Sequence, residues 1–347
     1  MVSNRIRDII IKKRLFNFSE FHNSKLSFEV LNEYQLQTIN KFNNKVRSGE
    51  IEFESVPCLC GGIEFDNIAS VDGKSFIQQT MICRNCGLIQ SNPRMTDKQY
   101  REFYESDFYR ISYEGTDFSS DIYQQRYNSE KGMHIFKEIE NVKSINSITK
   151  VIEIGAGGGW NLIPFIDRGA PAVGIDYSPR LVQMGIEHGI NMRQGGIEEI
   201  NDEYDIIIIN HVLEHFLDPV SALKKIVYHL KNNGIIYIAV PNILNFSLGQ
   251  LQNAHSYYFT PASFQYYIST AGLRLLKFGN VQNIHMFGIF SAEPMIAKLN
   301  FPEGNYEYMV KFLRNQKYKI LFVKVLKKIY LYQLLRIIYR KIVNISN

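Results

Sequence analysis

Three glycines spaced by single residues follow a short apolar run and would let a ligand approach the backbone closely. Gly155, Gly157 and Gly159 come directly after residues 151–154, a run typical of a buried strand. Glycine allows a sharp turn and removes the Cβ atoms that would block the carboxyl end of the strand. Asp176 ends a second β-rich run about 20 residues later, where a carboxylate can bond both hydroxyls of a ribose. The spacing predicts a site for an adenosine compound, the alternative being a structural glycine turn in another α/β protein.

Three ionisable side chains crowd one turn after a later apolar run. If the segment were helical, His211, Glu214 and His215 would share one face, because residues three and four apart are neighbours on a helix. The string formally matches the H-x-x-E-H signature of a class of zinc proteases. We reject that interpretation because Asp218-Pro219 starts a new element, whereas the protease motif belongs to a longer helix. The turn is instead expected beside the cofactor pocket, at the carboxyl end of a central strand.

The four cysteines fall into two close pairs that have the spacing of metal ligands. Cys58 and Cys60 form one pair, and Cys83 and Cys86 form the other. Four thiolates complete a tetrahedral Zn²⁺ shell and leave no position for water, so such a metal would be structural. The first pair is one residue tighter than the usual C-x-x-C, and four ordinary reduced thiols are the alternative. The pairs predict a small zinc-held module.

The elements that must position these groups alternate in character from Lys150 onward. Short β-rich runs are separated by helical stretches, which predicts a parallel sheet with helices on its faces and hence an α/β fold. Two further strands are expected near the end of this region, the last one antiparallel. The β-rich runs lie at residues 151–155, 172–176, 204–210, 234–240, 272–279 and 283–291.

The glycine motif has the form found in one large enzyme family. G-x-G-x-G preceded by Glu153 resembles motif I of class I S-adenosylmethionine (SAM)-dependent methyltransferases more than the dinucleotide motif G-x-G-x-x-G, so a nicotinamide cofactor is the second choice. The later strings Gly196-Ile197-Glu198 and LEHFLDP are similar to segments of the same family in the same order. The resemblance implies a Rossmann-like sheet of seven strands with SAM as cofactor. It implies cofactor contacts from Glu153, Gly155, Ala156, Gly157, Gly159, Asp176, Tyr177, Ile197, Glu198, Asn210 and His211.

The cysteine segment adds a second resemblance. The string CRNCGLIQSNPR at residues 83–94, followed by YREFY at residues 100–104, closely resembles the zinc-binding amino-terminal module of methyltransferases in sugar and surface-polysaccharide biosynthesis. In the sugar C-methyltransferases of that group the acceptor is a nucleotide-linked keto-sugar that the module helps to enclose, and others of similar layout methylate hydroxyls. The chain is expected to divide into a helical arm (1–56), a zinc-binding module (57–110), a helical connector (111–149), a methyltransferase domain (150–291) and a basic helical region (292–347).

Methyl transfer from a sulfonium needs an acceptor held in line and a group that accepts its proton. His215, oriented by Glu214, is the expected base, since the resemblance places a Glu-His pair here in sugar methyltransferases. The alternative is that the pair only organises the loop and caps the next helix. His255, in H-x-x-x-F-T-P, would offer a second polar group to the substrate, or only bond a neighbouring loop. Related quinone-biosynthesis methyltransferases hold a divalent cation with a Glu where His211 stands, and this departure argues against magnesium.

Length and net charge limit the classes of function that remain. The chain has 347 residues and a net charge of +5. Residues 301–347 carry ten Lys or Arg against two Glu, a balance of +8, which leaves −3 for residues 1–300. A mildly acidic body argues against an RNA methyltransferase, which should carry a basic face. A methyltransferase-like binding protein without turnover, recruiting a biosynthetic partner through its module, is the competing class of function.

The ends of the chain lead to an expected location. No apolar run approaches the roughly 20 residues of a membrane span, and the start lacks a signal-peptide pattern, so a cytoplasmic enzyme is expected. Residues 317–345 form a basic amphipathic pattern that would dock on the inner face of an anionic membrane. The alternative is a terminal helix packed on the protein's own core or on a second subunit in a homodimer.

Overall fold

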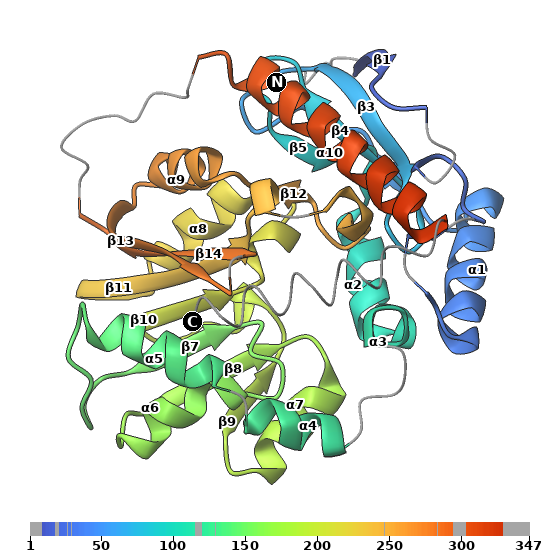
Figure 1. Cartoon of the computed structure of the whole chain (residues 1–347). Helices are drawn as coiled ribbons and strands as arrows, with labels where there is room; N and C mark the ends of the chain where they lie inside the picture. The colour runs from blue at the N-terminus through green and yellow to red at the C-terminus, as the bar shows by residue number, and fades with distance from the viewer. Residues whose placement is uncertain are drawn as a thin grey trace, which may run out of the picture.

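The computed structural model describes residues 9–17, 21–25, 27–28, 30–114, 120–128, 130–245, 247–282, 284–293 and 303–328. It has two main sheets, one built largely after residue 150 and one built mainly from residues 10–91 (Figure 1). Residues 57–110, which contain the four cysteines, are called the cysteine module below.

The larger sheet has seven strands in the order β13-β14-β11-β10-β7-β8-β9. The strands β7 to β11 pair in parallel, whereas β14 runs antiparallel to both of its neighbours. The predicted Rossmann-like sheet and its antiparallel last strand are therefore confirmed. The bounds are β7 (Val151–Ile154), β8 (Ala172–Asp176), β9 (Asn191–Gln194), β10 (Tyr204–Asn210), β11 (Leu230–Pro241), β13 (Arg274–Val281) and β14 (His285–Ser291).

Both faces of this sheet are buried, which is why its central strands are nearly continuous apolar runs. On β10, Ile207 and Ile209 pack with residues of α8 and α9, while Ile206 and Ile208 pack with residues of α5, α6 and α7. Successive side chains of a strand point to opposite faces, so a run of isoleucines serves both layers. The covering helices are α5 (Lys131–Glu140), α6 (Ile163–Asp167), α7 (Pro179–Glu187), α8 (Pro219–Val227) and α9 (Pro261–Thr270), and α4 (Ser120–Tyr127) precedes them.

The second sheet combines segments that are far apart in the sequence. Its order is β1-β3-β4-β5-β12. The strand β12 (Tyr257–Tyr258) comes from the loop between β11 and α9, within the part of the chain that forms the larger sheet and its helices, called the larger domain below. That loop pairs with the module through Tyr257 opposite Gln90. The other strands are β1 (Ile10–Arg14), β3 (Glu64–Val71), β4 (Ile77–Cys83) and β5 (Ile89–Ser91), and a separate pair is formed by β2 (Phe53–Glu54) and β6 (Arg94–Met95). The cysteine module and the larger domain thus share one sheet.

Helices complete the amino-terminal half. The segment expected to be a helical arm has the helix α1 (Glu33–Ser48) and also the strands β1 and β2. The helices α2 (Asp97–Glu105) and α3 (Asp107–Glu114) stand between the module sheet and the larger domain (Figure 1). Thr96 caps α2 by accepting a hydrogen bond from the backbone of Gln99, and Tyr100 and Phe103 bury one face of this helix. The packing fixes α2 beside the ends of the large sheet.

The carboxyl-terminal helix α10 (Asn305–Lys328) lies across the module sheet (Figure 1). Met309, Val310 and Leu313 are buried in one cluster with Ile68 and Ile82. The first turns of this helix therefore pack on the protein's own core. Residues 329–347 of the predicted membrane-docking segment lie outside the described residues. Within the described part of the chain, no helix is both long and apolar enough to cross a membrane.

Candidate active site

A single cavity of about 910 Å³ lies at the carboxyl ends of the parallel strands. One wall is formed by the loops after β7, β8, β9 and β10, and the facing wall by α2 and α3. This is the crevice where open α/β sheets bind ligands. The cavity is lined by the sequence-predicted residues Gly155, Asp176, Tyr177, Ile197, Glu198, His211 and His215.

The glycine turn and the acid after β8 are joined directly. The Asp176 carboxylate accepts hydrogen bonds from the backbone N–H of Gly157 at 2.8 Å and of Ser178 at 2.9 Å. Gly155 has φ +68°, and a Cβ atom there would lie 2.3 Å from a methyl carbon of Val212. Only glycine fits this position, because both the backbone conformation and the neighbour exclude a side chain. The turn is therefore bare where it meets the cavity, and the carboxylate beside it is held in a fixed orientation.

Other residues predicted to touch the cofactor support the turn from outside the cavity lining. The backbone N–H of Ala156 donates to the Ile175 carbonyl. Gly159 packs against the side chains of Ile190 and Met192, at the edge of the sheet formed by β9. Asn210 ends β10 without joining the lining residues. Ala156 and Gly159 belong to the glycine turn after β7, whereas Asn210 is the last residue of β10.

Glu153 is buried under the glycine turn. It accepts a hydrogen bond from the Asn161 side chain at 2.7 Å, and its second carboxylate oxygen has no hydrogen-bond partner among the described residues. Burial raises the pKa of Glu153 to about 8; the Asn161 hydrogen bond lowers the pKa and the Asp176 charge raises it. The carboxyl group is therefore held neutral near pH 7.

This raised pKa makes stability depend on pH. Between the ordinary pKa of 4.5 and about 8, the folded state holds a proton that the unfolded state releases, so Glu153 contributes stability below pH 4.5 that is lost as pH rises. Glu153→Gln keeps the oxygen that bonds Asn161 and removes the titration. We expect the free energy of unfolding of the variant, relative to wild type, to rise with pH by up to about 1.4 kcal/mol per unit. Urea unfolding at pH 5, 6.5 and 8 measures this, and a pH-independent difference would contradict it.

The ionisable cluster after β10 surrounds one buried carboxylate. Glu214 is 1% exposed, and its Oε1 lies 3.6 Å from His211 Nδ1 and 3.9 Å from His215 Nε2. Burial alone would raise the pKa of Glu214, but interaction with His211 and His215 outweighs it and lowers the pKa to about 2. The segment Leu213–His215 is one 3-10 turn (η4), so it is no protease helix. The Glu214 carboxylate therefore places a negative charge beside both imidazoles.

Two structural features orient the imidazoles. His211 has a left-handed backbone with φ 57°, which is uncommon outside glycine, and donates its N–H to Ala239. His215 Nδ1 lies 2.9 Å from the Ala254 carbonyl and 2.7 Å from the Tyr104 hydroxyl. A proton on Nδ1 that bonds the carbonyl leaves Nε2 as the unprotonated nitrogen. This tautomer, assigned from the hydrogen bonds, can accept a proton.

His255 is buried beside His215. It is 4% exposed, it does not line the cavity, and its ring lies 4.9 Å from that of His215. Burial, followed by the charge of His215, lowers the pKa of His255 to about 3. The structure thus puts a neutral imidazole behind His215.

Sequence reasoning missed the wall that faces these residues. Tyr100, Arg101 and Tyr104 of α2 and Tyr109 of α3 line the cavity. The rings of Tyr104 and Tyr109 pack at a tilt of 57°, with centroids 4.9 Å apart. The string YREFY carries a family resemblance, but none of its residues is a predicted site residue. Its i, i+3 and i+4 spacing on one amphipathic helix was the available signal.

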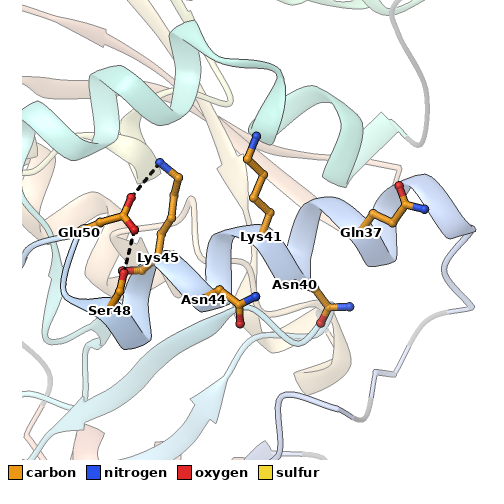
Figure 2. A pocket seen from close by; sticks show the side chains of 7 residues that line it. All are labelled: Gln37, Asn40, Lys41, Asn44, Lys45, Ser48 and Glu50. Carbon is orange, nitrogen blue, oxygen red and sulfur yellow. Dashed lines mark hydrogen bonds and ion pairs between the residues drawn. The ribbon is translucent and has the colours of Figure 1, made fainter.

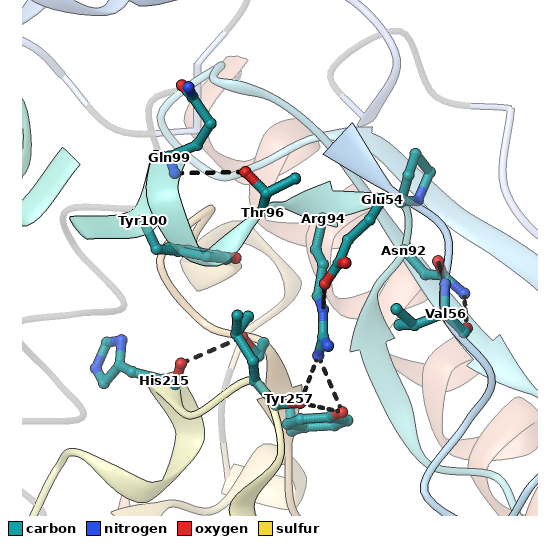
Figure 3. Close-up of polar contacts among 12 residues, drawn as sticks. Glu54, Val56, Asn92, Arg94, Thr96, Gln99, Tyr100, His215 and Tyr257 are labelled. Atoms are coloured by element: carbon teal, nitrogen blue, oxygen red, sulfur yellow. Dashed lines mark hydrogen bonds and ion pairs between the residues drawn. The ribbon is translucent and has the colours of Figure 1, made fainter. Parts of the chain in front are cut away.

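Arg94 connects the cysteine module to the loop that carries His215. Its guanidinium donates to the Leu217 carbonyl at 2.7 Å and to the Tyr257 hydroxyl at 3.1 Å, and it pairs with Glu54 at 3.1 Å (Figure 3). Arg94 is 7% exposed, so these partners replace water around a buried cation. The end of the loop that carries His215 is therefore fixed by a residue of the cysteine module.

Removing this guanidinium is expected to destabilise the fold. Arg94→Met keeps most of the side-chain volume but leaves the Leu217 carbonyl and Glu54 without their donor. Hydrogen bonds to charged groups contribute about 1.5–3 kcal/mol, so we expect a loss of about 2–3 kcal/mol in urea unfolding. Arg168→Met is the control, because the Arg168–Glu140 pair lies at the surface and should cost under about 1 kcal/mol. Equal losses in both variants would contradict the assignment.

The four cysteines meet at one point. Cys58 Sγ lies 3.5 Å from Cys86 Sγ, Cys60 Sγ lies 3.7 Å from Cys83 Sγ, and all four sulfur atoms lie within 4.8 Å of one another. A tetrahedron with Zn–S bonds of about 2.3 Å has sulfur atoms roughly 3.8 Å apart. The four thiols fit such an ion. The Tyr267 hydroxyl of α9 reaches Cys86 Sγ at 3.5 Å and so joins this cluster to the larger domain.

A second depression follows the exposed side of α1 and has a different character (Figure 2). It is lined by polar side chains such as Gln37, Asn40 and Lys41. Glu50 pairs with Lys45 at 3.3 Å and accepts a hydrogen bond from Ser48. It contains no predicted site residue.

Comparisons with known proteins find methyltransferases that are similar to the part of the chain that carries the glycine turn and His215. Residues 121–277 match a family model described as a methyltransferase domain. The "Ubiquinone biosynthesis O-methyltransferase" of Pelagibacter ubique is 31% identical over 125 residues, which cover 34% of this chain and 52% of that protein. The protein of the same description from Rickettsia prowazekii is 31% identical over 115 residues, 30% of this chain and 46% of its own length. The chain spans about half the length of these curated relatives.

Solved structures with a similar arrangement are distant. A putative S-adenosylmethionine-dependent methyltransferase from Listeria monocytogenes is 16% identical with a TM-score of 0.40, and covers 46% of this chain and 97% of its own. A SAM-dependent methyltransferase from Thermotoga maritima is 15% identical with a TM-score of 0.40, over 50% of this chain and 95% of its own.

Proposed function

We propose that this chain, whose residues 121–277 match a methyltransferase domain, is a class I SAM-dependent enzyme that methylates a sugar or glycan biosynthetic intermediate carried on a nucleotide. The observation that carries the proposal is that one cavity is lined by both Asp176 and His215. A ribose-binding carboxylate and a proton acceptor in one cavity are what a transfer from SAM to a nucleophile requires.

SAM, when bound, supplies an electrophilic methyl group on a sulfonium. The chain's own residues would bind and orient it: Asp176 receives the ribose hydroxyls, Tyr177 lies against the adenine, and the Gly155 turn lets the cofactor approach the backbone. His215 would take the proton of the acceptor on Nε2, while Ala254 holds the opposite side of its ring. Glu214 stays anionic and stabilises the imidazolium that forms. The Tyr104 hydroxyl would hold the same nitrogen, Nδ1, that faces Ala254.

Support for a sugar acceptor comes from the cysteine module and from the tyrosines of α2 and α3 that line the cavity. The module string at residues 83–104 resembles that of sugar methyltransferases. Tyr100, Tyr104 and Tyr109 offer aromatic faces together with hydroxyl groups, a combination that suits ligands with both apolar and polar surfaces. We propose that these rings pack on one face of the sugar.

A second candidate is O-methylation of a phenolic quinone precursor. It is favoured by the description of the curated relatives as ubiquinone biosynthesis O-methyltransferases. The same tyrosines would stack on a phenol ring, and His215 would take a phenolic proton.

Mass spectrometry with methyl-labelled SAM separates these functions. The purified chain is incubated with a panel of nucleotide-linked keto- and hydroxy-sugars and with a panel of dihydroxylated aromatic acids. A labelled sugar product supports the proposal, and a labelled aromatic product alone would replace it with the quinone-type function. SAM binding without labelling of either panel would favour a binding protein that lacks turnover.

We also propose that the four cysteines hold a structural Zn²⁺. The ion would leave no open position for water, so it would tie the segment before β3 to the turn between β4 and β5 and take no part in the reaction. Elemental analysis should find about one zinc per chain. Cys86→Ser should lose the metal and lower the melting temperature by about 5 °C or more. Native protein with four thiols open to titration and no metal would contradict the proposal.

A further inference from the structure

We infer that helix α2 of the cysteine module completes the adenosine end of the cofactor site, with Arg101 as the residue that positions Tyr177. The inference rests on the proposed function, because it concerns SAM in the cavity described above. It adds a cofactor-positioning residue that lies outside the methyltransferase motifs.

Arg101 and Gly196 confine the Tyr177 ring from two directions. The Arg101 guanidinium lies over this ring, 6.0 Å from its centroid. A Cβ atom on Gly196 would lie 2.1 Å from the Tyr177 hydroxyl oxygen, so the ring rests against bare backbone. The hydroxyl also interacts with the Glu198 carboxylate. The ring that is expected to face the adenine is thus held by contacts from two separate segments of the chain.

The position of Arg101 is fixed within α2. Its Nε donates to Asp97 Oδ2 at 2.9 Å, one turn earlier on the helix. Asp97 and Arg101 line the same cavity as Asp176 and Glu198. Arg101 is therefore a cation among the carboxylates that line the cavity. An adenine that packs on the Tyr177 ring would lie next to its guanidinium. A cation over an aromatic ring at a half-exposed site is worth a few-fold in an equilibrium constant.

The same helix also reaches the acceptor end. Arg101 and Tyr104 are three residues apart and share one face of α2. Tyr104 contacts His215, and the Tyr100 hydroxyl donates to the Asn253 carbonyl. One helical turn thus connects the residue over Tyr177 with the residue at the proposed base. A cofactor seated against Tyr177 should stabilise α2 as a whole.

Calorimetry with S-adenosylhomocysteine tests the role of Arg101. Arg101→Ala should raise the Kd by about three- to tenfold, and Arg101→Lys should recover part of the loss because it keeps the cation. Lys98→Ala is the matched control: Lys98 lies on the same helix, exposed and outside the cavity, and its Kd should equal that of wild type. In turnover, Arg101→Ala should raise KM for SAM and leave kcat within about twofold. In a Tyr177→Leu background, Arg101→Ala should have little further effect, because its partner is gone.

Hydrogen exchange supplies a second readout that does not depend on turnover. Adding S-adenosylhomocysteine should protect the backbone of residues 97–105 in wild type and protect it less in Arg101→Ala. If wild type binds the nucleoside while Arg101→Ala binds equally well and residues 97–105 gain no protection, this inference is wrong and the proposed function stands. If wild type binds no nucleoside, the proposed function itself fails.

Discussion

Asp176→Ala is expected to weaken SAM binding by at least about 100-fold. The carboxylate would accept hydrogen bonds from both ribose hydroxyls, and such charged hydrogen bonds contribute about 1.5–3 kcal/mol each. It also accepts from the backbone N–H of Gly157, so its loss removes a contact that shapes the glycine turn. Titration calorimetry with SAM and with S-adenosylhomocysteine measures the effect.

The control separates binding from folding. Asp167→Ala removes an exposed carboxylate at the end of α6 and should leave both affinities unchanged. Asp176→Asn keeps an oxygen for the Gly157 N–H but removes the charge, so its Kd should fall between those of wild type and Asp176→Ala. An Asp176→Ala protein that is folded and binds SAM as wild type does would contradict the assigned site.

His215→Ala is expected to lower kcat by about 10²- to 10⁴-fold, the usual range for loss of a general base. The Kd for SAM should stay near that of wild type, because the imidazole belongs to the acceptor end of the cavity. The expected pattern is therefore a loss in turnover without a loss in cofactor binding. Stopped assays with an acceptor found by mass spectrometry, together with calorimetry, supply both numbers.

A structural role for His215 would give a different pattern. If Glu214 and His215 only organised the loop, His215→Ala would lower the melting temperature and leave kcat per folded molecule unchanged. His188→Ala is the control, because this exposed histidine lies outside the cavity and its Nδ1 faces the Met184 carbonyl one turn earlier on α7. Unchanged turnover in a folded His215→Ala protein would remove the base from the mechanism.

Local patterns predicted the large sheet and the turn after its first strand. The central strands are apolar runs buried on both faces, so composition identified every strand of this sheet except β9, and Gly155 and Asp176 lie at the carboxyl ends of neighbouring strands. The two cysteine pairs also came together as their spacing predicted. In each of these cases the signal lies within a few neighbouring residues.

Contacts between distant segments could not be predicted in this way. The strand β12 is only Tyr257–Tyr258, and its pairing with β5 depends on how the larger domain docks on the module. Tyr104 and Arg101 occupy an ordinary amphipathic helix, and nothing in their spacing says which loop they face. For His255 the sequence left both a substrate contact and a loop contact open; its loop is held inward where the backbone N–H of Asn253 donates to buried Asp72. Tertiary packing decided each of these positions.

The most direct test of the central claim is a crystal structure of the full chain with S-adenosylhomocysteine. The account predicts the nucleoside over the Gly155 turn, its ribose hydroxyls on the Asp176 carboxylate, its adenine at Tyr177 and its sulfur toward His215. A nucleoside bound elsewhere on the protein, or a turn filled by side chains when the ligand is present, would contradict it.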